Sequence, residues 1–208
     1  MPQVILRPMR LADIEEVIVL NRLGFSLPWA RSTYRYEIAK NDRSTMLVME
    51  NAAEQKPRSE RQPNGWLQQL FGFKPAQESE TGKLIGYAGF WQVLDEAHIS
   101  TITVHPDWRG KNLGELMLWK MITLAIEQDA NKVTLEVRVS NAVAKALYFK
   151  YGFEIVGIRH RYYRDNNENA DIMMVEPLDD EYQARLKTFE ADLLDRIALI
   201  DRFAQLTP

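Results

Sequence analysis

The sequence predicts an α/β protein built around one mixed sheet, because short apolar segments rich in β-branched and aromatic residues alternate with segments of helical periodicity. A hydrophobic content of 46% with 26% charged residues is typical of a soluble globular protein. The length of 208 residues is enough to bury a substantial core. Together these observations exclude a chain that is mainly disordered.

The N-terminal part is predicted to form a strand followed by two helices. Residues 4–6 form a short apolar strand, and the next segment repeats its core-facing side chains at helical spacing, namely Leu11, Ile14, Val17, Ile18 and Asn21. Pro28 ends that helix, because proline disfavours the helical conformation in the residue before it. We then expect Ser32 to cap a second helix that runs through Lys40.

Two strands, over residues 45–50 and 84–93, are predicted on either side of a long polar segment. That segment, residues 51–82, holds three prolines among many Gln, Glu and Ser residues, and this composition does not easily bury a core. Residues 66–73 form one apolar cluster in its middle. We expect a flexible insertion in a hairpin, and we favour a tolerated loop over a docking element for a ribosome, a partner or a membrane surface.

The alternation becomes more regular after Gly89. In chain order the sequence predicts a strand, an amphipathic helix, a strand, a second helix and two final strands, over residues 97–104, 113–128, 133–139, 141–151, 153–158 and 171–175. The polar segment 164–170 joins the last two strands as a hairpin loop, because it is rich in Asp and Asn. Residues 1–178 are therefore predicted to form one domain.

The C-terminal segment, residues 179–208, is predicted to be a helical extension. Its apolar residues lie on one stripe, namely Tyr182, Leu186, Phe189, Leu193, Ile197 and Ile200. A helix over residues 180–203 would be about 36 Å long at 1.5 Å per residue. We expect this amphipathic helix to pack on the domain, with a dimer contact as the alternative.

Composition excludes several classes of protein. The net charge of −3 lacks the basic excess of a protein that binds nucleic acid directly, and the absence of cysteine excludes disulfides, iron–sulfur clusters and a thiolate nucleophile. The three histidines have no metal-ligand spacing, so we expect no metal site. An acidic N-terminal segment and the lack of a long uncharged stretch predict a cytoplasmic protein without a membrane span.

The segment 104–115 combines a strand end, a turn, a loop with glycine and basic residues, and a helix start. Free backbone N–H groups and the helix dipole at such a point favour an anion such as a pyrophosphate, and Arg109 and Lys111 add positive charge. Considered alone, this pattern also fits an ordinary turn before a helix.

Two side chains further along the chain predict acid–base chemistry. Leu135 and Val137 alternate with Glu136 and Arg138, so a carboxylate points off a central strand on the face opposite the apolar residues. The next helix, with Ser140 as its expected cap, carries Asn141 and Tyr148 on one face two turns apart. A structural ion pair for Glu136, with Arg138 or another cation, and a core position for Tyr148 are the alternatives.

The order of these motifs resembles the GNAT acetyltransferase superfamily, and more narrowly the RimI-type ribosomal-protein-alanine N-acetyltransferases. The resemblance covers residues 2–50 and 83–178, and rests on a few stretches: Leu94 to Ala97, Arg109 to Gly114, Leu135 to Asn141, Ala146 to Tyr148, Ile158 to Tyr163 and Phe25 to Trp29. It implies a GNAT fold whose central sheet is splayed, with the long hairpin insertion and the C-terminal amphipathic helix as additions.

The resemblance also implies an N-terminal acetyltransferase that transfers the acetyl group of acetyl-CoA directly, in a ternary complex, to the N-terminal alanine of a small-subunit ribosomal protein. It implies that Glu136 is the general base and Tyr148 the acid that protonates the leaving thiolate. The residues expected to bind acetyl-CoA are Ile102, Thr103, Val104, Arg109, Gly110, Lys111, Asn112, Leu113, Gly114, Glu115 and Asn141, with the Val104 N–H as oxyanion donor. Those expected to bind the protein substrate are Leu27, Tyr162 and Tyr163.

Asn112 departs from the family pattern, which has glycine at the centre of the loop. Asparagine tolerates the left-handed conformation better than other non-glycine residues, so the departure concerns cofactor affinity more than the fold. Two other functions stay open: a GNAT enzyme for a small amine or an antibiotic, and a CoA-binding scaffold without turnover. We expect a monomer or a weak dimer.

Overall fold

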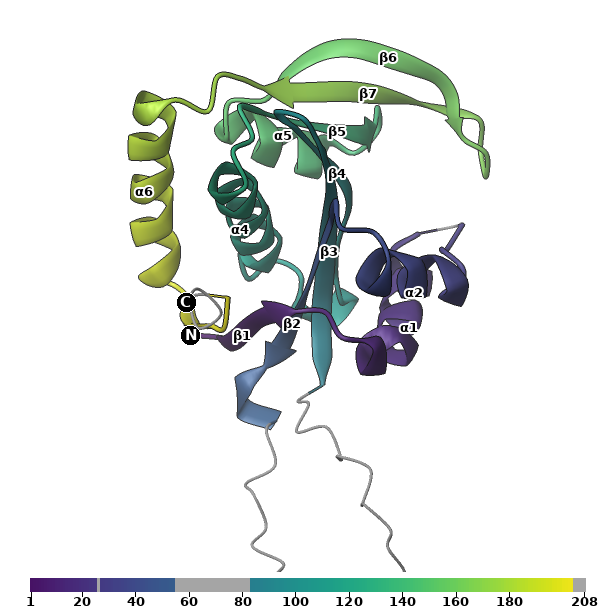
Figure 1. The fold of residues 1–208 in the computed structure, drawn as a ribbon, viewed down its shortest axis with the longest axis vertical. Helices are drawn as coiled ribbons and strands as arrows, with labels where there is room; N and C mark the ends of the chain where they lie inside the picture. The colour runs from purple at the N-terminus through teal and green to yellow at the C-terminus, as the bar shows by residue number, and fades with distance from the viewer. Residues whose placement is uncertain (26, 55–82, 204–208) are drawn as a thin grey trace, which may run out of the picture.

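The computed structural model describes residues 1–208 except 26, 55–82 and 204–208. Within the described residues, one sheet has the strand order β6-β7-β5-β4-β3-β2-β1-β8 (Figure 1). Its strands are β1 (Gln3–Pro8), β2 (Ser44–Asn51), β3 (Leu84–Val93), β4 (Glu96–Val104), β5 (Lys132–Arg138), β6 (Glu154–Tyr163), β7 (Glu168–Val175) and β8 (Ala198–Asp201). The β4–β5 and β1–β8 pairs are parallel and the other neighbours are antiparallel, so the predicted mixed sheet is confirmed.

Helices cover both faces of the sheet. The α-helices are α1 (Ile14–Gly24), α2 (Arg31–Ala39), α4 (Leu113–Glu127), α5 (Ala142–Lys150) and α6 (Asp180–Leu194), and the short 3-10 helices are η1 (Leu11–Asp13), η2 (Ala52–Glu54) and η3 (Pro106–Trp108). Helices α1 and α2 lie on one face, whereas α4, α5 and α6 lie on the other (Figure 1). Each face therefore has its own apolar cluster.

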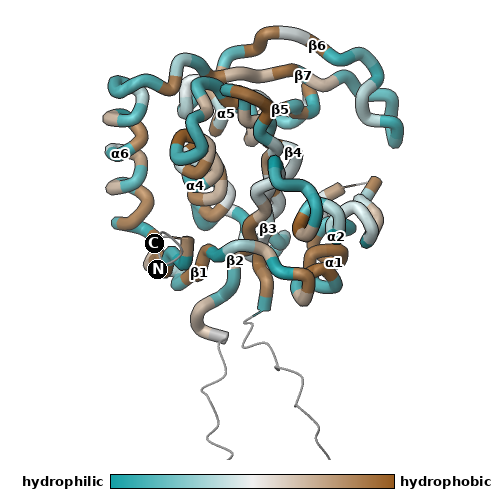
Figure 2. Tube along the Cα trace, viewed as in Figure 1, coloured by the Kyte–Doolittle hydropathy of each residue, from teal (hydrophilic) through white to brown (hydrophobic). Residues whose placement is uncertain are grey.

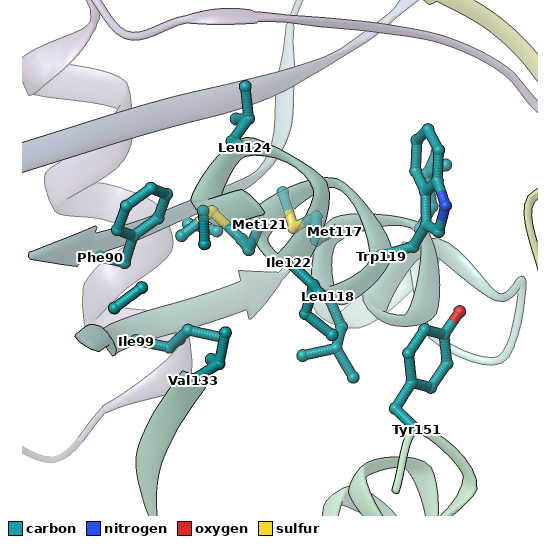
Figure 3. Close-up of a cluster of buried hydrophobic side chains, with 14 of the residues drawn as sticks. Phe90, Ile99, Met117, Leu118, Trp119, Met121, Ile122, Leu124, Val133 and Tyr151 are labelled. Carbon is teal, nitrogen blue, oxygen red and sulfur yellow. The ribbon is translucent and has the colours of Figure 1, made fainter. Parts of the chain in front are cut away.

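Helix α4 is the centre of the larger cluster. Ten of its fifteen residues are buried, because the sheet covers one side of the helix and α6 lies along the other (Figure 1). Its hydrophobic residues accordingly extend around much of the helix (Figure 2). In Figure 3, Phe90, Ile99 and Val133, from three neighbouring strands, face the α4 side chains.

The sheet opens between the neighbouring strands β4 and β5. β4 and β5 pair only over residues 96–99 of β4 and 132–135 of β5, although both strands continue beyond that point. A register irregularity in the β3–β4 ladder leaves Ser100 out of the pairing, so Ile99 and Ile102, three residues apart, both pack on the α4 side. The two strands therefore diverge, which is the splayed arrangement expected for the fold.

Three sequence-based expectations about helix ends are wrong. Helix α2 begins at Arg31 with Ala30 as its N-cap, so Ser32 lies inside the helix and does not cap it. Asn141, and not Ser140, caps α5, because its Oδ1 accepts a hydrogen bond from the Ala144 N–H at 3.2 Å. The C-terminal helix ends at Leu194 instead of continuing to Phe203.

The last described residues form a strand where a helix was expected. β8 pairs in parallel with β1, from Gln3 opposite Ala198 to Leu6 opposite Asp201. Ile197 is buried in the main cluster, whereas Ile200 is about half exposed. The apolar periodicity was ambiguous over this short run, and the open edge of β1 provided hydrogen-bond partners that favour a strand.

The insertion expected over residues 51–82 lies almost entirely outside the described residues. The strands on either side of it, β2 and β3, do pair antiparallel as the two arms of a hairpin. Among the described residues, no helix is both long enough and apolar enough to cross a membrane.

Candidate active site

A cleft of about 780 Å³ occupies the opening between β4 and β5. Glu136 and Thr103 line it from the side of α1, and Tyr148 and Asn141 line it from the side of α4 and α5. The cleft therefore passes through the sheet from one face to the other. Most of the residues predicted for the site line it: Ile102, Thr103, Val104, Arg109, Gly110, Asn112, Leu113, Gly114, Glu115, Glu136, Asn141, Tyr148 and Tyr163.

The free edge of β4 presents backbone groups to this cleft. The His105 N–H donates to the Ile85 carbonyl of β3 at 2.8 Å, and N–H groups alternate between the two edges of a strand. The N–H groups of Val104 and Ile102 therefore point away from β3, toward the gap left by β5. Because β5 has already diverged, these two donors are oriented toward a ligand in the cleft.

The loop between β4 and α4 adopts the conformation that the anion-binding interpretation requires. Gly110 has φ +73° and Asn112 has φ +60°, so asparagine occupies the left-handed position just before the helix. A Cβ added at Gly110 or Gly114 would meet no atom within 4 Å, which shows that the space over the loop is open. The N–H groups of Leu113, Gly114 and Glu115 belong to the first helical turn, where they lack intrahelical acceptors.

The charged side chains of this loop are held by local contacts. Arg109 Nε donates to the Val104 carbonyl at 3.3 Å, and Lys111 Nζ donates to the Asp107 carbonyl at 3.4 Å. Lys111 also lies 4.4 Å from the centre of the Trp108 ring and does not line the cleft. Glu115 is paired with Lys150 at 2.5 Å, so its negative charge is neutralised beside the proposed anion position.

Glu136 lies between a histidine and an arginine. Its Oε2 is 3.0 Å from His98 Nε2, and its Oε1 is 3.0 Å from Arg159 Nη2. Burial acts to raise the pKa of the Glu136 carboxyl, but the hydrogen bond and charge of His98 and the charge of Arg159 outweigh it, so the pKa is lowered. Arg138 is not its partner, because that guanidinium pairs with Asp165 and Glu168.

Tyr148 has the opposite electrostatic character. Burial, with a smaller contribution from Tyr163, raises the pKa of its hydroxyl to about 12. Its ring packs at 5.7 Å from that of Phe153, and it lies on α5 at the wall of the cleft. The carboxyl of Glu136 is therefore ionised and the phenol of Tyr148 protonated near neutral pH.

The residues predicted to bind a protein substrate are not all in one place. Tyr163 lines the cleft, with Arg138 3.8 Å from its ring centre, while Tyr162 lies beside it at 43% exposure outside the lining. Leu27 is 62% exposed and also lies outside the lining, where Phe25 is found instead. The substrate roles of Leu27, Tyr162 and Tyr163 stay predictions.

His98 and Arg159 are site residues that sequence reasoning did not single out. The spacing of the histidines indicates no role for His98, yet it faces Thr134 in the β4–β5 register and so lies on the same sheet face as Glu136. Arg159 reaches Glu136 from β6, which is far away in the sequence. Period-two alternation along β4 would have placed His98 on that face, but no local pattern indicates Arg159.

Comparison with known proteins identifies the family to which the chain belongs. The sequence model of the Acetyltransferase (GNAT) family matches residues 36–153, which is more than half of the chain. The chain belongs to the GNAT acetyltransferase family. The matched range runs from within α2 to the residue before β6, and so contains the loop between β4 and α4, Glu136 and Tyr148.

Two curated relatives of this GNAT acetyltransferase share their descriptive name. A Bacillus subtilis (strain 168) protein provisionally named a ribosomal protein bS18-alanine N-acetyltransferase is 36% identical over 169 residues, covering 81% of this chain and 93% of the relative. The Escherichia coli (strain K12) ribosomal protein bS18-alanine N-acetyltransferase is 39% identical over 99 residues, covering 47% of this chain and 67% of the relative.

A solved structure agrees with this family assignment. The crystal structure of the Escherichia coli ribosomal-protein-S18-alanine N-acetyltransferase superposes with a TM-score of 0.63 and 25% identity. The superposition covers 84% of this GNAT chain and 94% of the other. The splayed sheet and its helices thus have the GNAT fold.

Proposed function

We propose that this GNAT acetyltransferase transfers the acetyl group of acetyl-CoA to the α-amino group of an N-terminal alanine, in a ribosomal protein such as bS18. The proposal is carried by one observation: a cleft through the sheet has an ionised carboxylate, Glu136, on one face and a protonated phenol, Tyr148, on the other. The names of the two curated relatives support the choice of acceptor.

The residues along the cleft fit acetyl-CoA. Open space over Gly110 and Gly114 leaves room for phosphate oxygens beside the free N–H groups of the loop and first helical turn. The free edge of β4 suits the amide-rich pantetheine arm, for which Ile102, Thr103 and Asn141 are the proposed partners. Acetyl-CoA supplies the acetyl group, bound to a sulfur that departs as the thiol.

Each proposed catalytic group has one task. A peptide α-ammonium, with a pKa near 7.7–8.0, must lose a proton before its nitrogen attacks, and the Glu136 carboxylate receives that proton through a water. The Val104 N–H donates to the oxygen of the reacting carbonyl, where negative charge develops. As the new C–N bond forms and the C–S bond breaks, the Tyr148 hydroxyl donates its proton to the departing sulfur.

The acceptor enters from the face of α1 and α2. Gly24 and Phe25 line that end of the cleft from α1 and the residue that follows it, and Tyr163 lines it from β6. Tyr162, whose ring packs on that of Tyr163, and Leu27, two residues after Phe25, are exposed, and we assign them to the chain that follows the acetylated residue. The enzyme acts in the cytoplasm as a monomer or weak dimer, with no metal and no direct contact to nucleic acid.

The first experiment measures acetyl transfer from acetyl-CoA to short peptides that begin with Ala, Ser, Met or acetyl-Ala. Transfer to free N-terminal Ala peptides is expected, with none to acetyl-Ala. A panel of polyamines and aminoglycosides is assayed in parallel. Transfer to small amines alone would replace the proposal with a small-amine GNAT enzyme.

The same assay is run with Glu136→Gln. We expect the rate to fall about a hundredfold or more, because the amide cannot accept the ammonium proton. Calorimetric binding of CoA to the variant is the control, since it does not require the base. CoA binding without transfer to any acceptor, in the unaltered protein, would favour a scaffold instead.

A further inference from the structure

Four polar side chains on β4 and β5 form a hydrogen-bonded chain that ends at Glu136. His98 Nε2 lies 3.0 Å from Glu136 Oε2, and His98 Nδ1 lies 3.0 Å from Thr134 Oγ1. Thr134 Oγ1 in turn donates to Glu96 Oε1 at 2.7 Å. The parallel register, with His98 opposite Thr134 and Ala97 opposite Val133, brings these side chains together.

The direction of each hydrogen bond follows from counting protons. A carboxylate only accepts, so the single hydroxyl proton of Thr134 must point to Glu96. The Thr134 oxygen therefore has only lone pairs to offer His98, and the hydrogen bond between them requires a proton on His98 Nδ1. Thr134 and Glu96 thus determine which ring nitrogen of His98 is protonated.

This assignment has a consequence at the other ring nitrogen. If His98 were neutral with its proton on Nδ1, the Nε2 lone pair would face a carboxylate oxygen of Glu136 at 3.0 Å, which is repulsive. The contact is favourable only when a further proton lies between the two atoms. The same pair without Thr134 would need no such proton, because a neutral imidazole would then carry its proton on Nε2 and donate it to Glu136.

We propose that Glu96 and Thr134 are positioning residues that make the His98–Glu136 pair store one proton, which must leave to solvent before the pair accepts a proton from the acceptor amine. The proposal rests on the proposed function. No bond other than to hydrogen changes: the stored proton passes to water, and one proton from the ammonium later takes its place.

The groups around the pair determine where the stored proton lies. Arg159 faces the second Glu136 oxygen from β6, the hydroxyls of Tyr162 and Tyr163 approach from the same strand, and the Trp91 ring stacks on His98 from β3 with centres 6.1 Å apart. The charge of Arg159 beside the second Glu136 oxygen favours the carboxylate form of Glu136, so the proposal assigns the stored proton to the imidazole.

The ring nitrogens of His98 give a test that needs no substrate. The chain has three histidines, so the ¹⁵N-labelled ring signals in long-range proton–nitrogen spectra are few, and His98→Asn identifies the signal of His98. As the pH rises, the ring is expected to pass from doubly protonated to the form with its proton on Nδ1. A neutral form with its proton on Nε2 in the unaltered protein would overturn the proposal.

Thr134→Val provides the matched comparison, because it removes the hydroxyl and keeps the shape of the side chain. The neutral ring in this variant is expected to carry its proton on Nε2, whereas Thr134→Ser retains the behaviour of the unaltered protein. An unchanged tautomer in Thr134→Val would show that Thr134 does not determine it. Thr188→Val, at an exposed threonine of α6, controls for the substitution itself.

The pH dependence of acetyl transfer tests the second half of the proposal. In Thr134→Val the acidic limb of kcat/KM is expected to move to lower pH by about one unit, which is a tenfold change in proton affinity. The reason is that neutral His98 can then carry its proton on Nε2 and donate it to Glu136, so that loss of the stored proton is easier. A limb that does not move, although the tautomer has changed, would overturn the role of the stored proton. Failure to acetylate any peptide would refute the proposed function, while the ring spectra would still decide the tautomer.

Discussion

At the scale of single residues, the surroundings of Glu136 and Tyr148 shift their pKa values in opposite directions. Glu136 is nearly buried, yet its contacts with His98 and Arg159 keep the pKa of its carboxyl low. Tyr148 lines the cleft and has no such partner within the described part of the chain, and burial raises the pKa of its hydroxyl to about 12. One group can therefore receive a proton and the other can donate one at the same pH, which is the arrangement that acid–base catalysis requires.

Tyr148→Phe tests the proposed acid. The variant keeps the ring that packs against Phe153, so the fold and CoA binding are expected to stay unchanged. The rate of acetyl transfer is expected to fall about a hundredfold, because the departing sulfur loses its proton donor. Steady-state kinetics and calorimetric CoA binding measure the two effects. A rate within twofold of the unaltered enzyme would exclude Tyr148 as the acid.

At the scale of elements, the junction of β4 and α4 depends on one unusual backbone position. Asn112 has φ +60° immediately before α4, and Leu116 N–H donates to its carbonyl at 3.0 Å. The left-handed conformation of this residue turns the chain so that the first N–H groups of the helix face the cleft. Because asparagine and glycine adopt this conformation more readily than other residues, the departure from the family pattern leaves the loop intact.

The variants Asn112→Ala and Asn112→Gly distinguish the effect of the backbone conformation on acetyl-CoA binding from the effect of the asparagine side chain. The left-handed conformation costs alanine about 1–2 kcal/mol, so the loop of Asn112→Ala would adopt the binding conformation less often. We therefore expect acetyl-CoA to bind roughly tenfold more weakly to this variant. Asn112→Gly is expected to bind at least as tightly as the unaltered protein. Calorimetric titration with acetyl-CoA measures both. Equal losses in the two variants would mean that the asparagine side chain itself contacts the cofactor.

At the scale of the whole molecule, the C-terminal extension completes the sheet and covers α4. The hydroxyl of Tyr182 on α6 donates to the Tyr151 carbonyl at 3.0 Å, just after α5. The strand β8 adds Asp201, which pairs at 2.7 Å with Lys120, a residue of α4 that is only 4% exposed. The extension therefore connects β8 to α4, the helix that follows the β4–α4 loop (Figure 1).

Removing the partner of the buried lysine is expected to destabilise the fold. Asp201→Asn leaves the Lys120 charge without its counter-ion and should lower the free energy of unfolding by about 1–3 kcal/mol. The double variant Lys120→Met/Asp201→Asn should regain most of that loss, because no buried charge remains. Urea unfolding followed by circular dichroism measures both variants. Additive losses in the double variant would show that the two side chains do not interact energetically.

The sequence by itself determined the order of the elements as far as α6, and the resemblance to the GNAT superfamily supplied most of the residues that line the cleft. Alternating periodicity located β3 at the bounds that the structure has, and placed Glu136 and Tyr148 on elements that both border the gap between β4 and β5. These features are local: they depend on side-chain period and on glycine or asparagine at a turn, which neighbouring residues alone decide.

Only the tertiary structure decided which charged groups meet. Arg159 lies on β6 and Glu136 on β5, and β7 separates the two strands in the sheet, so their contact depends on the bending of the β6–β7 hairpin, which Figure 1 shows as curved. The end of α6 was decided in the same way, because the free edge of β1 stabilised residues 198–201 as a strand. Which distant segments pair depends on the assembled sheet. The apolar periodicity of a single segment therefore does not predict its pairing partner.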